Sequence, residues 1–194
     1  MRKYFNNLSD KWDNIAFHDP LKLDVILENL DLKTGHRILD IGSGTGVFLE
    51  RLSEKAEPNG HIIAFDIAEQ MLLISRKKHF PLKISYLQGM GETIPLRDES
   101  CHRVLCYSVF PHFKEKCDVL NEIKRILHPR GILVIAHSQG RDKINAIHKK
   151  IEGPVSGDYL PDKEEMSILL KKTNFFIRNI IDNDEIYCYV VCKE

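Results

Sequence analysis

A short run of glycines is the stretch in which the sequence points most clearly to chemistry. The segment from Gly42 to Gly46 reads Gly-Ser-Gly-Thr-Gly. Glycine adopts positive φ angles without strain and lets another group approach the backbone closely. Asp40 precedes the run, and a carboxylate there disfavours a pyrophosphate and favours a cation. The spacing also differs from the G-x-G-x-x-G pattern of dinucleotide-binding loops, so we predict a binding loop for a positively charged ligand.

A second group of residues is polar and rich in histidine. Its members are His18, His112, His137, Arg141, Asn145 and His148. His112 and His137 each follow an apolar run, and parallel sheets bind ligands beyond the carboxyl ends of their strands. Arg141, Asn145 and His148 are spaced i, i+4 and i+7, so they share one face of a predicted helix. We expect these residues to lie around the opening of one binding site. Imidazoles in such a site serve as general bases, anion ligands or metal ligands.

The elements that must position these residues follow from the apolar pattern. The run at 38–41, broken only by Asp40, is typical of a strand that is buried on both faces. A second run at 61–65 predicts a strand that ends at Asp66. A carboxylate there can accept two hydrogen bonds from a ribose diol. The alternative role for Asp66 is to cap the helix predicted at 68–78, but the glycine run before it favours ribose binding.

The remaining pattern predicts alternating strands and helices. Further strands are predicted at 83–87, 103–108, 132–136, 175–181 and 185–192. Further helices are predicted at 47–56, 114–127 and 141–151. Ser9 is expected to cap a short helix, and Asp19 to cap a longer one that begins at the following proline. Asp162 and Glu165 predict a capping box for a helix that Asn174 closes in the left-handed conformation.

Composition limits the class of protein and its partners. A chain of 194 residues suits one domain, and Lys+Arg equals Asp+Glu at 28 each. A net charge of zero gives no general attraction to nucleic acid or to an anionic membrane, so neither is an expected partner. Five cysteines without a C-x-x-C pair indicate free thiols in a reducing cytosol. With no targeting segment and no apolar run of membrane length, we expect a cytoplasmic protein whose oligomeric state stays open.

The segment from Leu39 to Gly46, Leu-Asp-Ile-Gly-Ser-Gly-Thr-Gly, resembles the first motif of the class I S-adenosylmethionine-dependent methyltransferases. The resemblance extends from about Lys33 to the C-terminus. S-adenosylmethionine carries an ammonium, a sulfonium and no phosphate, which suits the carboxylate beside the loop. The family implies a Rossmann-like α/β fold, a three-layer αβα sandwich. Its seven-stranded, mostly parallel sheet has the order 3-2-1-4-5-7-6, with the last strand antiparallel.

We expect one methyltransferase domain over residues 1–194, with a helical N-terminal segment at 1–32 and a substrate-side helix and loop at 138–161. The resemblance implies S-adenosylmethionine as the cofactor and a set of residues that bind it. These are Asp40, Gly42, Ser43, Gly44, Thr45, Gly46, Asp66, Ile67, Met71, Gly89, Met90, Gly91, Glu92, Tyr107 and Ser108. Met90 stands where the family usually has an aspartate that contacts the adenine amine. Its thioether can lie against the adenine face instead.

The leading hypothesis is a methyltransferase that transfers the methyl group in line to a small-molecule acceptor. His112 and His137 are the candidate catalytic residues, and the whole histidine-rich group is the candidate substrate site. No tight ligand pair such as H-x-x-x-H occurs, so we predict no metal. A nucleotide-dependent oxidoreductase is an alternative that Asp40 and the glycine spacing disfavour. A noncatalytic protein that binds S-adenosylmethionine or a metal stays open because Met90 departs from the motif.

Overall fold

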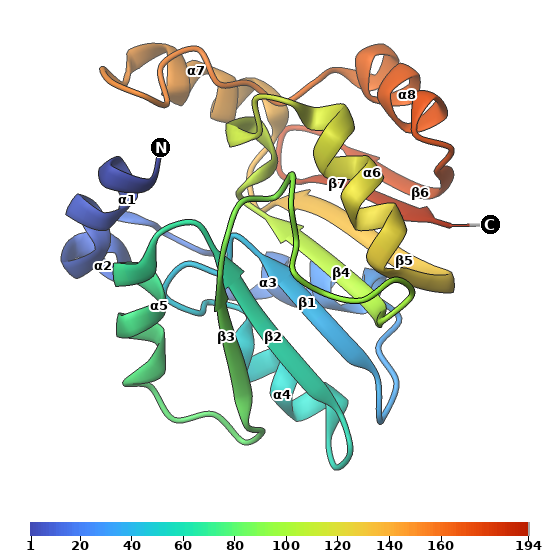
Figure 1. Ribbon diagram of the computed structural model, residues 1–194. Coiled ribbons are helices and arrows are strands. Elements are labelled where there is room, and N and C mark those ends of the chain that lie inside the picture. The colour runs from blue at the N-terminus through green and yellow to red at the C-terminus, as the bar shows by residue number, and fades with distance from the viewer. Residues whose placement is uncertain (194) are drawn as a thin grey trace.

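The computed structural model describes residues 1–193 and has a seven-stranded sheet at its centre (Figure 1). The strands are β1 (Arg37–Ile41), β2 (His61–Asp66), β3 (Ile84–Gln88), β4 (Cys101–Tyr107), β5 (Leu127–His137), β6 (Phe176–Asp182) and β7 (Tyr187–Cys192). Their spatial order is β3-β2-β1-β4-β5-β7-β6. The strands from β3 to β5 pair in parallel, whereas β7 runs antiparallel to both of its neighbours. The predicted order and the antiparallel last strand are confirmed.

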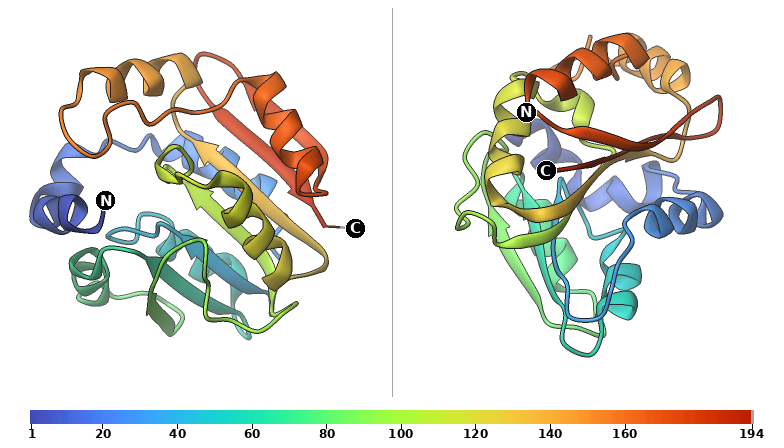
Figure 2. Two further views of the ribbon diagram at one scale, coloured as in Figure 1. Left: turned by 45° about the horizontal axis from the view of Figure 1, so that its top comes forward. Right: turned by 90° about the vertical axis from the view of Figure 1, so that its right-hand side faces the viewer.

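Helices cover both faces of the sheet, which gives the three layers seen edge-on in Figure 2. The α-helices are α1 (Arg2–Leu8), α2 (Trp12–Ile15), α3 (Pro20–Asn29), α4 (Leu49–Ala56), α5 (Glu69–Arg76), α6 (Lys116–Ile126), α7 (Arg141–Lys150) and α8 (Lys163–Lys172). Two short 3-10 helices complete the set, at Ser9–Lys11 and Phe110–His112. One apolar core lies between the sheet and α6 with α8, and the other lies between the sheet and α3 to α5.

Strand β1 shows why the sheet is buried on both sides. Leu39 and Ile41 point into the core beneath α6 and α8, whereas Ile38 points into the opposite core. Successive side chains of a strand face opposite sides, so an unbroken apolar run fills both cores at once. This arrangement holds the carboxyl end of β1, and the glycine loop after it, on rigid backbone.

Three helix ends are capped by the residues that the sequence predicts. Asp19 caps α3 and accepts a hydrogen bond from the backbone N–H of Leu21. Asp162 and Glu165 form the predicted capping box of α8. Asn174 follows α8 with a φ angle of 54°, in the left-handed region that asparagine tolerates.

Two expectations about the chain's elements are wrong. Ser9 does not cap a helix, because a helix already runs from Arg2 to Leu8 and the Ser9 hydroxyl donates to the carbonyl of Asn6. Strand β5 begins at Leu127 instead of residue 132, because Leu127 pairs with Cys101 across a bulge in the ladder.

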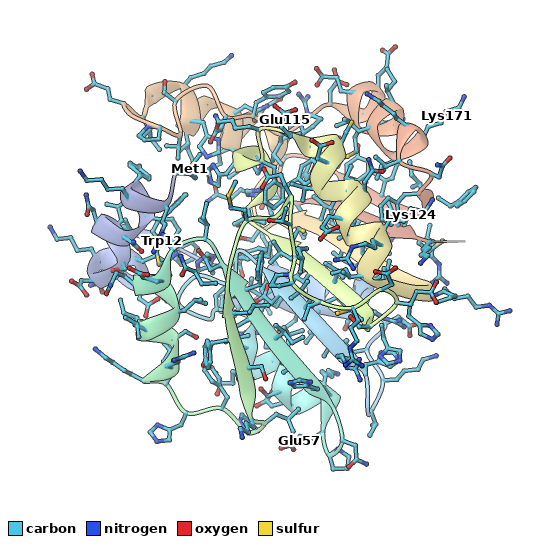
Figure 3. All side chains as sticks on the ribbon, in the orientation of Figure 1. Met1, Trp12, Glu57, Glu115, Lys124 and Lys171 are labelled. Atoms are coloured by element: carbon cyan, nitrogen blue, oxygen red, sulfur yellow. The ribbon has the colours of Figure 1, made fainter. Side chains whose placement is uncertain are left out.

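The N-terminal segment and α7 stand over the same edge of the sheet (Figures 1 and 2). Figure 3 labels Met1 and Trp12 on this segment, and Glu57 at the opposite end of the sheet. The strands β1, β2 and β4 end beneath these elements, so their carboxyl ends are covered by segments from both halves of the chain. Over residues 1–193, no helix combines the length and apolarity needed to cross a membrane.

Candidate active site

Two adjoining cavities open at the carboxyl ends of the strands. The first has a volume of about 370 Å³ and lies over the glycine loop and the ends of β2 and β4. The second has a volume of about 300 Å³ and lies between the N-terminal segment and α7. Both cavities are lined by Phe5, Trp12, His18, Ser108 and His112, which we call the shared wall. The two cavities therefore adjoin at these side chains.

The glycine loop forms the floor of the first cavity. The backbone N–H groups of Gly42 and Ser43 both donate to the carbonyl of Phe65, over 2.8 and 3.1 Å, which ties the loop to β2. Gly44 has a φ angle of +53°, and a Cβ placed on it would meet only Trp12 Nε1 at 3.8 Å and the carbonyl oxygen of Gly42 at 4.0 Å, both at ordinary contact distance. The position is therefore open toward the cavity, and a ligand can approach the backbone closely there.

Asp66 joins the loop to the start of α5. Its Oδ2 accepts from the backbone N–H of Gly44 over 2.9 Å, and its Oδ1 accepts from the N–H of Ala68 over 2.7 Å. Burial raises the pKa of Asp66, and these backbone hydrogen bonds oppose that rise. A carboxylate has about four lone-pair sites, so both oxygens can still accept from a ligand hydroxyl. The geometry is thus compatible with ribose binding and with the capping role together.

Most of the residues predicted to bind the cofactor line the first cavity. Those that do are Gly42, Ser43, Gly44, Thr45, Asp66, Ile67, Met71, Gly89, Met90, Gly91, Glu92, Tyr107 and Ser108. Asp40 and Gly46 do not line it. Asp40 is buried, and its pKa is raised well above the usual value by burial and by the neighbouring Asp66. A Cβ on Gly46 would lie 2.6 Å from Ser75 Oγ, so this glycine lets the loop approach α5.

The lining of the first cavity fits S-adenosylmethionine. Asp66 and Glu92 supply carboxylates, and Phe65, Ile67 and Met71 supply apolar surface for a base and a ribose. The hydroxyl oxygen of Ser43 is buried and has no hydrogen-bond partner within the described residues. An unpaired buried hydroxyl costs about 1–3 kcal/mol, which a bound ligand can recover. Met90 is 54 % exposed and lies at the rim, so its thioether is free to contact an adenine ring.

Ser108, a residue of the shared wall, has an uncommon backbone conformation. Its φ angle of 54° lies in the left-handed region, and its N–H donates to the carbonyl of Ala136 over 2.9 Å. Non-glycine residues in this region store of the order of 1–3 kcal/mol of strain, and such strain gathers at functional sites. No feature of the sequence indicates this conformation, because serine has no special preference for it.

The second cavity has apolar walls and a polar end. Its apolar side chains include Tyr4, Leu8 and Phe17 from the N-terminal segment, with Ile144 and Ile147 from α7. Its polar end is formed by His137, the last residue of β5, and by Ser138 and Gln139, which follow it. Ser138 and Gln139 were not predicted, although the strand-end argument that selected His137 applies to them as well.

Two polar atoms at this end have no partner within the described residues: His137 Nε2 and Gln139 Oε1. His137 is 3 % exposed. Burial lowers its pKa to about 3, and the nearby histidines His112, His148 and His18 lower it further. The imidazole is therefore neutral at ordinary pH, which makes it a poor base and a suitable hydrogen-bonding group.

The remaining predicted histidines are held by hydrogen bonds around the cavities. His18 Nδ1 bonds to the hydroxyl of Tyr107 over 2.8 Å, and that hydroxyl bonds to Ser138 Oγ over 2.7 Å. His148 Nδ1 bonds to the carbonyl of Asp158 over 2.9 Å. Burial is the main cause that lowers the pKa of both His18 and His148. All four predicted histidines, His18, His112, His137 and His148, thus line the second cavity.

Asp158 was not predicted, and it binds two residues of the site. Its Oδ2 lies 2.8 Å from His112 Nδ1, and its Oδ1 accepts from Lys114 Nζ. The residue is 4 % exposed. Burial acts to raise the pKa of Asp158, but hydrogen bonds from His112 and Lys114 outweigh it and lower the pKa. Asp158 lies in the irregular segment after α7, where no motif or periodic pattern marks a functional position.

Arg141 and Asn145 line neither cavity. Arg141 pairs with the adjacent Asp142 at 3.0 Å. Asn145 exchanges two hydrogen bonds with the backbone of Leu160, at 3.1 and 2.7 Å. The cavity-facing stripe of α7 is centred on its isoleucines, so these two polar residues lie beside the stripe and not on it. We leave both out of the proposed acceptor site. Over residues 1–193, no group of three or more His, Cys, Asp or Glu side chains could hold a metal ion.

Comparison with known proteins agrees with this geometry. A family model described as a methyltransferase domain matches residues 39–135. A malonyl-[acyl-carrier protein] O-methyltransferase of Marinomonas sp. is 31 % identical over 142 residues, which is 72 % of this chain and 52 % of that protein. A ubiquinone/menaquinone biosynthesis C-methyltransferase of Wigglesworthia glossinidia brevipalpis is 33 % identical over 142 residues, or 68 % of this chain and 56 % of that protein. The chain thus spans about half the length of these curated relatives.

Among solved structures, a SAM-dependent methyltransferase from Aquifex aeolicus superposes with a TM-score of 0.74 and 21 % identity. The superposition covers 99 % of this chain and 98 % of that one. This likeness shows that the two chains share the fold. The family model covers half of the sequence, and the curated relatives exceed 30 % identity over more than two thirds of it. The chain therefore belongs to the class I S-adenosylmethionine-dependent methyltransferase family, and S-adenosylmethionine is its cofactor.

Proposed function

We propose that this protein transfers the methyl group of S-adenosylmethionine, bound in the first cavity, to a small acceptor bound in the second. The observation that carries the proposal is the shared wall, because it brings the two cavities together at the carboxyl ends of β4 and β5. Holding two reactants in the right geometry can supply about 7–11 kcal/mol of a reaction barrier. Juxtaposed cavities are what such a reaction requires.

In this proposal the glycine loop and Asp66 hold the cofactor. The open position at Gly44 lets the ligand approach the backbone, and Asp66 accepts from the ribose hydroxyls. Apolar side chains line most of both cavities. When bound, S-adenosylmethionine supplies an already activated methyl group on a sulfonium whose positive charge disappears during transfer, and a dry site favours that change.

The second cavity supports an acceptor with an apolar body and a hydrogen-bonding group at one end. The apolar side chains of α1, α2 and α7 contact the body. His137 Nε2 and Gln139 Oε1, which have no hydrogen-bond partner among residues 1–193, receive the polar group. Gln139 Oε1 only accepts hydrogen bonds, so the acceptor presents an N–H or O–H to it.

The relatives support methyl transfer but not one acceptor atom. One is named as an O-methyltransferase and another as a C-methyltransferase. Each is about twice the length that this chain matches, so the acceptor of neither is carried over. The shape and polarity of the second cavity are the better guide to the acceptor.

Calorimetry with S-adenosylmethionine, S-adenosylhomocysteine and NAD tests the cofactor site. We expect binding of the first two ligands and none of the third. Methyl transfer is then measured with labelled S-adenosylmethionine across a panel of phenols, amines, carboxylic acids and thioethers with apolar bodies. Cofactor binding without transfer to any member would contradict the proposal and favour the noncatalytic alternative.

A further inference from the structure

We infer that His112 is the general base of this site, that Asp158 is its positioning residue, and that the acceptor atom is therefore an oxygen or nitrogen that carries a proton. The inference rests on the proposed function and adds to it the chemical class of the acceptor. It starts from one relationship, the hydrogen bond between His112 Nδ1 and Asp158 Oδ2 at 2.8 Å.

The position of His112 is the first argument. It follows β4 in the 3-10 helix at Phe110–His112 and belongs to the shared wall, so it faces both the cofactor cavity and the acceptor cavity. A general base has to lie within hydrogen-bond reach of the nucleophile that the methyl group approaches. No other predicted histidine except His18 lines both cavities, and His18 is already bonded to the hydroxyl of Tyr107.

The tautomer of His112 is the second argument. A buried carboxylate accepts hydrogen bonds and does not donate them, so the proton of the neutral imidazole sits on Nδ1, facing Asp158. Nε2 then carries the free lone pair, and no hydrogen bond within residues 1–193 engages it. This orientation is the one that a base needs, and a carboxylate behind the ring also stabilises the imidazolium that forms.

The support around Asp158 is the third argument. Lys114 occupies the other carboxylate oxygen, and the backbone carbonyl of Asp158 bonds to His148 Nδ1 over 2.9 Å. The ring of Phe5 lies edge-on to that of His112, with centroids 5.3 Å apart. The carboxylate and the ring are thus held from several elements, as a positioned catalytic pair has to be.

The step that follows is balanced in protons and electrons. As the acceptor's O–H or N–H proton passes to His112 Nε2, the freed electron pair forms the bond to the methyl carbon, and the C–S pair returns to sulfur to give S-adenosylhomocysteine. His112 later releases the proton to solvent. A nucleophile without a proton, such as a thioether, would need neither His112 nor Asp158.

Replacement of Asp158 by asparagine tests the inference without any acceptor. Lys114 would keep the amide oxygen, so the NH2 group would face His112 Nδ1 and donate to it. The ring proton would then move to Nε2, and the base would lose its free lone pair. Imidazole 15N chemical shifts report which nitrogen carries the proton, and His112→Asn identifies the signal of His112. We expect the Nδ1–H tautomer in the wild type and the Nε2–H tautomer in Asp158→Asn.

Kinetics with the acceptors that the panel identifies supply the second measurement. We expect Asp158→Asn to lower kcat by about 10²- to 10⁴-fold, the usual contribution of general acid–base catalysis, with little change in KM. The cofactor Kd should not change, because Asp158 does not line the first cavity. Adding Asp158→Asn to His112→Asn should cause almost no further loss, since a positioning residue acts only through its partner.

Tyr187→Phe is the matched control, because it removes a different hydrogen bond to the irregular segment that carries Asp158. The Tyr187 hydroxyl donates to the carbonyl of Pro161 over 3.1 Å, and the residue lines neither cavity. This variant should keep the wild-type tautomer and kcat. An Nε2–H tautomer in the wild type, or full turnover in Asp158→Asn with a proton-bearing acceptor, would overturn the inference and leave methyl transfer intact. Wild-type protein that methylates no acceptor would instead contradict the proposed function itself.

Discussion

The carboxylate of Asp66 accepts a hydrogen bond from the backbone N–H of Gly44 over 2.9 Å, so the end of β2 fixes the middle of the loop that follows β1. The second oxygen of the same carboxylate accepts from Ala68 and fixes the start of α5. One side chain therefore shapes two sides of the first cavity, which makes it a sensitive test of the cofactor site.

We expect Asp66→Ala to raise the Kd for S-adenosylmethionine by at least about tenfold, measured by calorimetry. The variant loses hydrogen bonds from a carboxylate, which contribute about 1.5–3 kcal/mol each, and it releases Gly44. Asp142→Ala, on the exposed side of α7, is the control and should bind normally. A normal Kd in Asp66→Ala, with lowered stability alone, would mean that Asp66 only caps α5.

Gly44→Ala should weaken cofactor binding far more than Gly35→Ala, although both glycines have positive φ angles of +53° and +81°. A Cβ at Gly35 would meet nothing within 4 Å, so that variant measures backbone strain alone, of about 1–2 kcal/mol. At Gly44 the methyl group would also project where the ligand approaches. Thermal unfolding and calorimetry on both variants separate the two effects, and equal Kd values would show that the loop does not cradle the cofactor.

The sheet and the glycine loop could be predicted from the sequence because their signals are local. The apolar run at β1 and the glycines after it specify a strand and a turn within ten residues, and the loop's position then locates Asp66 on the next strand. The same reasoning places His137, the last residue of β5, and His112, in the short 3-10 helix that follows β4.

Other parts of the site depend on contacts that no local pattern encodes. Asp158 lies in an irregular segment and acquires its partners, His112 and Lys114, only when the segment after α7 folds against the chain that follows β4. Asn145 shows the opposite case, a residue that was predicted for the site but does not line it. It lies on the predicted helix with His148, but its amide binds the backbone of Leu160. Helix α1 was not predicted: none of its residues is buried, and its apolar side chains Tyr4, Phe5 and Leu8 line the second cavity instead of the core.

Asn145→Ala should lower the free energy of unfolding by about 2–3 kcal/mol. The backbone N–H and C=O of the buried Leu160 would lose their partners, and each unpaired buried group costs of the order of 1–3 kcal/mol. Urea denaturation measures the loss. Ser167→Ala, which removes an exposed hydrogen bond in α8, should change stability little. If Asn145→Ala were as stable as the wild type but bound the acceptor more weakly, Asn145 would belong to the acceptor site.

His137→Asn should flatten the dependence of stability on pH in the acid range. The pKa of His137 falls from 6.5 to about 3 on folding, so the unfolded chain binds more protons between these values. Stability therefore falls as the pH falls below 6.5, by about 1.4 kcal/mol per pH unit for this residue.

Urea denaturation of both proteins between about pH 7 and pH 5 measures the difference. The comparison also removes the effects of Asp40 and Asp66, whose raised pKa values favour the folded state in acid and so act in the opposite direction. Identical pH profiles of the two proteins would show that His137 is not held neutral by the fold.

Trp12 gives the shared wall an optical property. It is the only tryptophan of the chain, and its indole nitrogen lies 3.8 Å from the Cβ position of Gly44, on the lining of both cavities. Its fluorescence therefore reports occupancy of either cavity without a label. Titration with S-adenosylhomocysteine should change the emission in a saturable way, a later acceptor should change it again, and Trp12→Phe should abolish both signals.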